Sequence, residues 1–201
     1  MATRTAIKDP YHHGNLETAL VDAAIVLVRK YGPDHLSLRA VSAEVGVSPS
    51  ASYHHFGDKD ALVSAIGNVL FDRLAIMQEK AIAKVNGKGA SASIKKFEEM
   101  GNAYFSWATS EPNLYRLMFG GFCEINMDEH ESKAWNLLRD GLDELAAHGV
   151  IDKSVRNGGE LIVLSAVHGA SSLSIQGLMP PSDFPLVLKS IKRSLGIKPK
   201  D

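Results

Sequence analysis

The sequence predicts an all-α fold, and three observations support this prediction. Apolar residues recur at intervals of three and four over long stretches, which is the period of a helix with one buried face. No stretch alternates apolar and polar residues cleanly enough to predict a strand. The pairs Gly32-Pro33 and Pro180-Pro181 stand between periodic stretches, where they would end one helix before the next begins.

Residues that can cap helices mark the predicted helix starts in the first part of the chain. Serine, asparagine and aspartate serve this role because their side chains accept hydrogen bonds from free backbone N–H groups. The predicted caps are Asn15, Ser37, Ser48 and Asp58. The helix after Asp58 is long and covers about residues 59–84. Further helices are predicted near residues 93–109, 112–119, 129–148, 154–179 and 182–196.

Composition excludes several classes of protein. Hydrophobic residues make up 45% of the 201 residues and charged residues 22%, as in folded globular proteins. No apolar run approaches the ~18 to 20 residues of a membrane span, so we expect a cytoplasmic protein without a membrane partner. The single cysteine, Cys123, excludes an internal disulfide and a cysteine-based zinc cluster. We expect no cofactor and no metal.

The charge distribution does not by itself indicate a nucleic-acid partner. The formal net charge is −1. Residues 1–60 contain six lysines and arginines against seven aspartates and glutamates. A basic patch, which is the usual electrostatic mark of such a partner, is therefore not predicted.

Residues 37–59 have the pattern of a helix-turn-helix motif. This motif needs a small residue where the second helix crosses the first, a glycine at the turn and apolar residues between the helices. Ser42 and Gly46 lie four residues apart, flanked by valines, and a second short helix follows. Tyrosine, histidine and lysine come after it, at positions suited to phosphate contact.

At this point the chain resembles a known family. The segment from about Asn15 to Ile66 is similar to the DNA-binding domain of the TetR family of bacterial transcriptional regulators, through LSLRAVSAEVGVS, the signature Tyr53-His54-His55-Phe56 and the following Asp58-Lys59-x-x-Leu62. Later, LYRLMFG (114–120) and VHGASSL (167–173) resemble the ligand-binding half of a subgroup with a Trp-x-x-x-His-Gly motif, in which Leu164 replaces the tryptophan.

The resemblance implies double-stranded DNA as a partner and assigns roles at the motif. Residues at the amino end of the second helix would face bases, and those near its end would contact phosphates or adjacent bases. The candidate DNA-binding residues are Arg39, Ser48, Pro49, Ser50, Ala51, Tyr53, His54, His55 and Lys59. A metal site at the two histidines is not expected, because adjacent helical residues point about 100° apart, whereas a plain solvated face remains the alternative.

Two serines depart from the family pattern. Ser42 stands where the family usually has alanine, and Ser52 stands where an apolar residue usually closes the helix pair. We expect each hydroxyl to hydrogen-bond back to its own helix or to cost stability.

A dense set of aromatic and sulfur-containing residues lies between residues 97 and 135. Any one of them is an ordinary core residue by default, but as a set they could line an apolar cavity for a small hydrophobic or aromatic effector. His168 is either a hydrogen-bonded core histidine or a polar anchor in that cavity. The candidate effector-binding residues are Tyr104, Trp107, Tyr115, Phe119, Phe122, Trp135 and His168.

The last two predicted helices suggest a homodimer interface. The helix over 154–179 is rich in serine, alanine and glycine, which permit close approach of another helix, and the last helix carries a leucine-rich face. The resemblance implies a four-helix dimer bundle at this place. Packing within one subunit is the alternative.

The predicted organisation is a three-helix helix-turn-helix domain over residues 1–58 and a larger helical effector-binding and dimerisation domain over residues 59–201. The function that the resemblance implies is a repressor that binds a pseudo-palindromic operator as a dimer and is released by a small, mostly apolar effector. The alternative from another class is an all-helical carrier or enzyme without DNA binding, and an adaptor that has lost operator binding is a third. No nucleophile, base and acid stand in a recognisable arrangement, so an enzyme is not expected.

Overall fold

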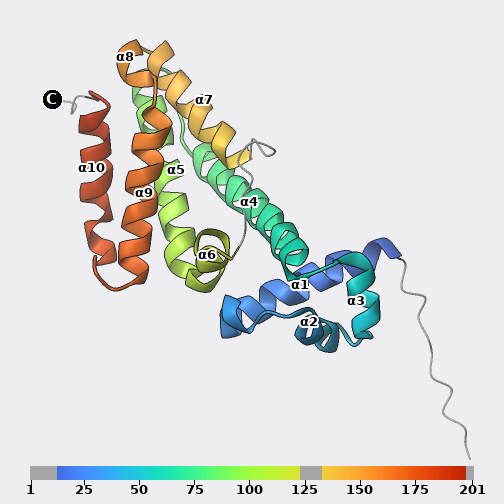
Figure 1. Ribbon diagram of the computed structural model, residues 1–201. Helices are drawn as coiled ribbons and strands as arrows, with labels where there is room; N and C mark the ends of the chain where they lie inside the picture. Colours follow the sequence, from blue (N-terminus) through green and yellow to red (C-terminus); the bar gives the residue numbers. More distant parts are fainter. Residues whose placement is uncertain (1–12, 123–132, 198–201) are drawn as a thin grey trace, which may run out of the picture.

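The computed structural model describes residues 13–122 and 133–197, and in these ranges it is helical with no strand. Figure 1 shows two lobes, one formed by α1 to α3 and the other by α5 to α10. Helix α4 (Lys59–Ala83) runs from the first lobe into the second. The predicted all-α fold is confirmed.

The N-terminal lobe follows three of the four predicted caps, whereas the predicted cap Asn15 lies inside the first helix, which begins at His13. It contains α1 (His13–Tyr31), the short 3-10 helix η1 (Pro33–His35), α2 (Leu38–Val45) and α3 (Pro49–His55). Ser37, Ser48 and Asp58 each accept a hydrogen bond from the backbone N–H three residues later, at 3.2, 3.3 and 2.8 Å. Gly46 ends α2 with a φ of 78°, a left-handed conformation that glycine adopts without steric cost.

The C-terminal lobe contains six helices in the described ranges. They are α5 (Ala90–Ser110), α6 (Pro112–Phe119), α7 (Lys133–Ala147), α8 (Lys153–Arg156), α9 (Gly159–Ile175) and α10 (Phe184–Ser194), with the 3-10 helix η2 (Pro181–Asp183) before the last. The first of these begins at Ala90 rather than at the predicted residue 93. The predicted start of α7 at residue 129 lies outside the described residues, as does Cys123.

The prediction of one continuous helix over residues 154–179 is wrong. The chain breaks at Asn157 and Gly158, and Gly158 has a left-handed φ of 79°. Gly159 then lies against α7, where an added Cβ would be 3.3 Å from a methyl group of Leu142. Two consecutive glycines therefore allow both the break and the close packing of α9 on α7. None of the helices in the described part of the chain is long and apolar enough to cross a membrane.

One apolar core continues through both lobes, and α4 connects its two parts. Leu62 and Ile66 are fully buried near the start of α4, beside the N-terminal helices, while Leu70 and Leu74 are buried farther along. Beyond its first turns α4 packs mainly on α5 and α7. The direction of the N-terminal lobe is therefore fixed by the same helix that forms the core of the C-terminal lobe.

The two unusual serines of the helix-turn-helix motif hydrogen-bond to each other. Ser42 and Ser52 are 1% and 0% exposed, and their hydroxyl oxygens lie 2.7 Å apart. Ser42 Oγ also lies 2.7 Å from the carbonyl oxygen of Leu38, to which it donates. Because a hydroxyl carries one proton, both bonds form together when Ser52 donates to Ser42. Only Ser42 bonds back to its own helix as expected, and Ser52 is satisfied across the helix pair.

Removal of one serine should therefore lower the free energy of unfolding by more than half of the loss caused by removing both. Ser42→Ala leaves the buried Ser52 hydroxyl without its partner, and we expect a loss of about 1–3 kcal/mol in the free energy of unfolding. The double variant Ser42→Ala/Ser52→Ala should lose less than the sum of the single losses, as measured by urea denaturation. Ser50→Ala, on the exposed side of α3, is the control and should change stability by less than about 0.5 kcal/mol. Strict additivity would show that the two hydroxyls are not coupled.

Candidate functional sites

The candidate DNA-binding residues gather around the exposed side of α3. Six of them are exposed, namely Arg39, Ser48, Pro49, Ser50, Tyr53 and His54. Ala51, His55 and Lys59 are partly buried. Phe56, which follows α3, is 4% exposed and lies in the core. Burial of Phe56 and of Ser52 fixes α3 on α2 while the opposite side of α3 stays free.

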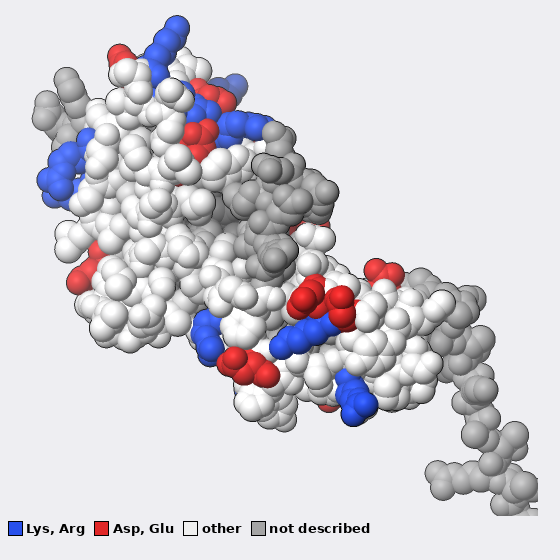
Figure 2. Space-filling view, viewed as in Figure 1, with Lys and Arg blue, Asp and Glu red and all other residues white. Residues whose placement is uncertain are grey.

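The electrostatics of this surface agree with the charge count. Figure 2 shows lysine and arginine beside aspartate and glutamate over the N-terminal helices, with no broad patch of one sign on the visible face. The rings of His54 and His55 meet edge to face with centroids 5.9 Å apart. The described residues contain no group of three or more histidine, cysteine or acidic side chains that could hold a metal ion.

His168 lies at the centre of the candidate effector site. The hydroxyl oxygens of Tyr104 and Tyr115 lie 3.1 and 3.0 Å from its Nδ1 atom. The rings of Tyr115 and Phe119 pack on the imidazole with centroids at 5.1 and 4.8 Å. Trp107 completes the set through its contacts with both tyrosines, at 6.3 Å between ring centroids in each case. Five of the seven predicted residues are thus brought together from α5, α6 and α9.

The hydrogen bonds at His168 leave the site neutral but able to donate or accept. Tyr115 donates its hydroxyl proton to the backbone carbonyl of His168 at 3.0 Å. Nδ1 can then accept from Tyr104, or carry the proton itself and donate to a phenol oxygen. Burial lowers the pKa of His168 and raises the pKa of both tyrosines. All three side chains are therefore uncharged at neutral pH, and Nε2 stays outside these hydrogen bonds.

The other two predicted effector residues lie apart from this cluster. Trp135 is partly buried on α7 and packs against the core. The ring of Phe122 instead faces Lys59, whose Nζ atom lies 6.0 Å from the ring centroid. Phe122, which was expected to bind the effector, therefore contacts Lys59, which was expected to bind DNA.

Sequence reasoning missed Phe71, whose ring meets that of Phe119 edge to face at 5.9 Å. An aromatic residue one position away from the main apolar stripe of α4 was the available signal.

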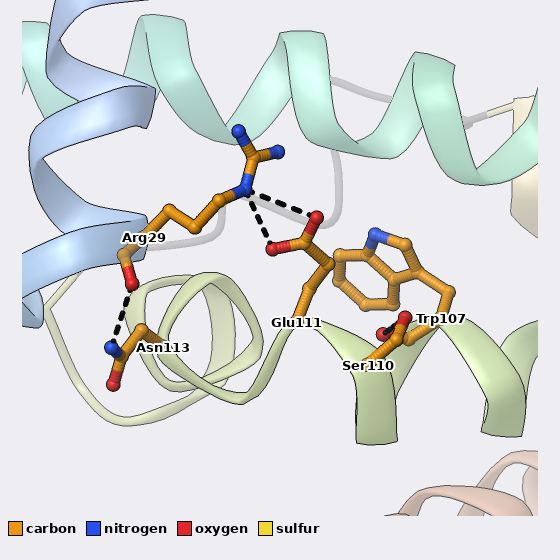
Figure 3. Close-up of polar contacts among 5 residues, drawn as sticks. All are labelled: Arg29, Trp107, Ser110, Glu111 and Asn113. Carbon is orange, nitrogen blue, oxygen red and sulfur yellow. Dashed lines mark hydrogen bonds and ion pairs between the residues drawn. The ribbon is translucent and has the colours of Figure 1, made fainter.

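Helix α6 also contacts the N-terminal lobe directly, as Figure 3 shows. Arg29, near the end of α1, donates through Nε to both carboxylate oxygens of Glu111, at 3.1 and 2.8 Å. Asn113 donates to the backbone carbonyl of Arg29 at 3.1 Å. Farther along α6, Arg116 pairs with Asp34 at 3.2 Å. No sequence signal indicated these contacts, because the partners lie more than eighty residues apart and are ordinary surface residue types.

The fold and these two surfaces define a helix-turn-helix protein with a second helical lobe, and comparisons with known proteins agree. Residues 20–66 match the family model for bacterial regulatory proteins of the tetR family, and residues 97–188 match the tetracyclin repressor-like C-terminal domain. The chain belongs to the TetR family. This family consists of transcriptional regulators rather than enzymes.

The individual proteins that resemble this chain share only a modest fraction of its residues. An uncharacterized HTH-type transcriptional regulator of Haemophilus influenzae is 30% identical over 105 residues, which is 50% of this chain and 47% of that protein. The matched region therefore spans about half the length of this curated relative. A protein of unknown function from Rhodococcus sp. RHA1 has a similar structure, with a TM-score of 0.69, 27% identity and coverage of 94% and 97% of the two chains. The TetR-family regulator HI0893 from Haemophilus influenzae shares the fold, with a TM-score of 0.67, 15% identity and coverage of 92% and 99%.

The partly buried His168 should make stability depend on pH. The pKa of His168 is lowered in the folded state, so the unfolded chain binds a proton more readily near pH 6. The stabilisation from neutral His168 is complete above its unfolded pKa of about 6.5 and is lost as the pH falls toward the folded pKa. Urea titrations from pH 7 to pH 5 should show a shallower decline for His168→Gln than for the wild type. His148→Gln, at an exposed histidine, should keep the wild-type slope, and equal slopes for all three would contradict this assignment.

Proposed function

We propose that this protein is a ligand-responsive transcriptional repressor that binds a pseudo-palindromic operator as a homodimer. The observation that carries the proposal is the free side of α3 on a helix pair that is otherwise buried through Ser42, Ser52 and Phe56. In this proposal residues 1–58 form the DNA-binding domain, and residues 59–201 bind the effector and the second subunit.

DNA binding without a basic patch is consistent with the chemistry of this surface. Pro49 and Ala51 offer apolar contact to thymine methyl groups, and Ser50 offers a hydroxyl to a base edge. Tyr53 offers a hydroxyl donor to phosphates, and the two histidines offer ring N–H donors. The amino end of α4, capped by Asp58, presents backbone N–H groups and Lys59 to a further phosphate. A dimer doubles every contact, so few cations are needed in each subunit.

The surface of α9 and α10 supports the proposed dimer. The two helices lie side by side at the edge of the C-terminal lobe, away from α1 to α3 (Figure 1). Leu161, Ile162 and Leu186 on this surface are 65%, 43% and 61% exposed. A groove between the helices is lined in part by Ile162 and Leu186. At Gly169 an added Cβ would meet no atom within 4 Å, which leaves room for close approach of another helix.

The cluster around His168 supports a small, neutral, mostly aromatic effector. Among the described residues, His168 contacts the hydroxyls of two tyrosines and the rings of Tyr115 and Phe119, and these groups are uncharged. A carboxylate or an ammonium group would lose its hydration here without gaining an opposite charge. A hydroxyl or carbonyl group, in contrast, can pair with the imidazole in either of its neutral forms.

Helix α6 provides a physical connection between the two proposed sites. Tyr115 and Phe119 contact His168 from one side of this helix, while Glu111, Asn113 and Arg116 hold α1 and the turn after it. The ion pairs are largely exposed, so each contributes little to stability. A tenfold change in DNA affinity requires only about 1.4 kcal/mol of preference between two positions of α6.

Selection of duplexes from a random DNA pool at about 0.15 M salt tests this function. We expect wild type to enrich a palindrome with two half-sites. Tyr53→Ala should lose most of the enrichment, because it removes a phosphate contact from an exposed position. Leu186→Glu should weaken enrichment by placing charge in the dimer interface, and sedimentation should show a monomer.

The possible outcomes of the selection separate the proposals. Enrichment of a single half-site would contradict the dimer. No enrichment by a folded dimer would contradict the regulator and favour a carrier or an adaptor. Equal enrichment by wild type and Tyr53→Ala would contradict the proposed role of α3.

Thermal denaturation with small ligands tests the effector class. A neutral phenol that binds at His168 should raise the melting temperature by about 5–10 °C at a hundredfold excess over its Kd, and the matching benzoate should not. His168→Phe should lose this response, because it keeps an aromatic ring but removes both ring nitrogens. His148→Phe should keep it. Stabilisation by benzoates and not by phenols would contradict a neutral effector.

A further inference from the structure

The contact between Lys59 and Phe122 joins a proposed DNA-binding residue to a residue that the sequence predicted for the effector site. Lys59 is the first residue of α4, at the edge of the surface that α3 presents to DNA. Phe122 lies three residues after Phe119, the last residue of α6. The Nζ atom of Lys59 lies 6.0 Å from the ring centroid of Phe122, within the range of a cation–π interaction.

The turn after α6 specifies where the Phe122 ring lies. A Cβ atom on Gly120 would be 2.5 Å from the carbonyl oxygen of Arg116, so only glycine fits at this position. The same Cβ would be 3.4 Å from a ring carbon of Phe122, which shows that the ring folds back over Gly120. Gly121 follows with a left-handed φ of 80°. Two glycines thus turn the chain so that the ring returns toward α4.

This turn is linked directly to the candidate effector site. Phe119 lies three residues before Phe122, and its ring contacts His168, Tyr115 and Phe71 at centroid distances of 4.8, 5.1 and 5.9 Å. A ligand that moves Phe119 therefore acts on the last residue of α6, immediately before the turn that carries Phe122.

We propose that Phe122 is a positioning residue that holds the Lys59 ammonium group away from the operator, so that DNA binding must break this contact. The inference rests on the proposed function, because it takes Lys59 as a phosphate contact. In this proposal the ammonium group must turn away from the ring to reach a phosphate, so the cation–π contact competes with DNA binding and lowers affinity. An effector that presses Phe122 toward Lys59 lowers it further. This gives the effector site a second route to the DNA surface, separate from the contact of α6 with α1.

Phe122→Leu in the full-length protein tests this inference, with affinity for the enriched duplex as the measurement. Leucine keeps apolar bulk but has no π face, so it should release Lys59 and raise affinity about two- to fivefold. Phe122→Tyr keeps the ring face and is the matched control, for which we expect wild-type affinity. Lys59→Met should weaken binding and lower the salt dependence by about one unit per subunit. In the Lys59→Met background, Phe122→Leu should have no effect.

A merely structural role for Phe122 predicts the opposite sign. Lower affinity for Phe122→Leu, together with a lower melting temperature, would overturn the inference. An equal gain for Phe122→Leu with and without Lys59 would overturn it as well, because the effect would then not pass through the lysine. Failure of wild type to bind any duplex would overturn the proposed function and this inference with it. Binding that weakens with Lys59→Met but does not strengthen with Phe122→Leu would overturn the inference alone.

Discussion

Burial of α4 along most of its length is the constraint on which both lobes depend. Its first turns complete the core beneath α1, and its later turns are covered by α5 and α7. Because the helix is continuous, with its hydrogen bonds unbroken, a change of angle at one end is carried to the other. The two lobes can therefore shift relative to each other only if side chains along α4 repack, which limits the number of stable arrangements.

Around this fixed helix, α6 makes the contacts that are easiest to change. Its ion pair with α1 and its pair with Asp34 are largely exposed, whereas its tyrosine and leucine side chains are buried. The polar contacts of α6 with the N-terminal lobe are weak, whereas its apolar contacts with the C-terminal core are strong. Helix α6 can therefore move relative to α1 as one rigid unit. The arrangement places the smallest energetic cost of movement at the boundary between the lobes.

Local signals in the sequence were sufficient to predict most of the longer helices. Caps such as Ser37 and Asp58 act over three residues, so a short stretch of sequence is enough to predict where a helix begins. The break at Asn157 and Gly158 was missed although residues 156–160 carry no apolar side chain and include Asn-Gly-Gly, which favours a turn. The close packing of Gly159 on Leu142 could not be predicted, because it depends on how α9 lies against α7. The convergence of Tyr104 and Tyr115 on His168 was predicted only as a set of residue types. The pairing of Arg29 with Glu111 was not predicted, since it depends on how distant helices pack.

The hydroxyl pair of Ser42 and Ser52 has a consequence for protein engineering. Recognition helices are natural units to exchange between related scaffolds when a new binding specificity is wanted. Here one partner of a buried hydrogen bond, Ser52, lies on α3, and the other partner, Ser42, lies on α2. A transplanted α3 with an apolar residue at this position would remove the donor to the Ser42 hydroxyl, leave Ser42 only its bond to Leu38, and crowd an interface sized for two hydroxyl groups. The unit that can be exchanged without such a mismatch is therefore α2 together with α3.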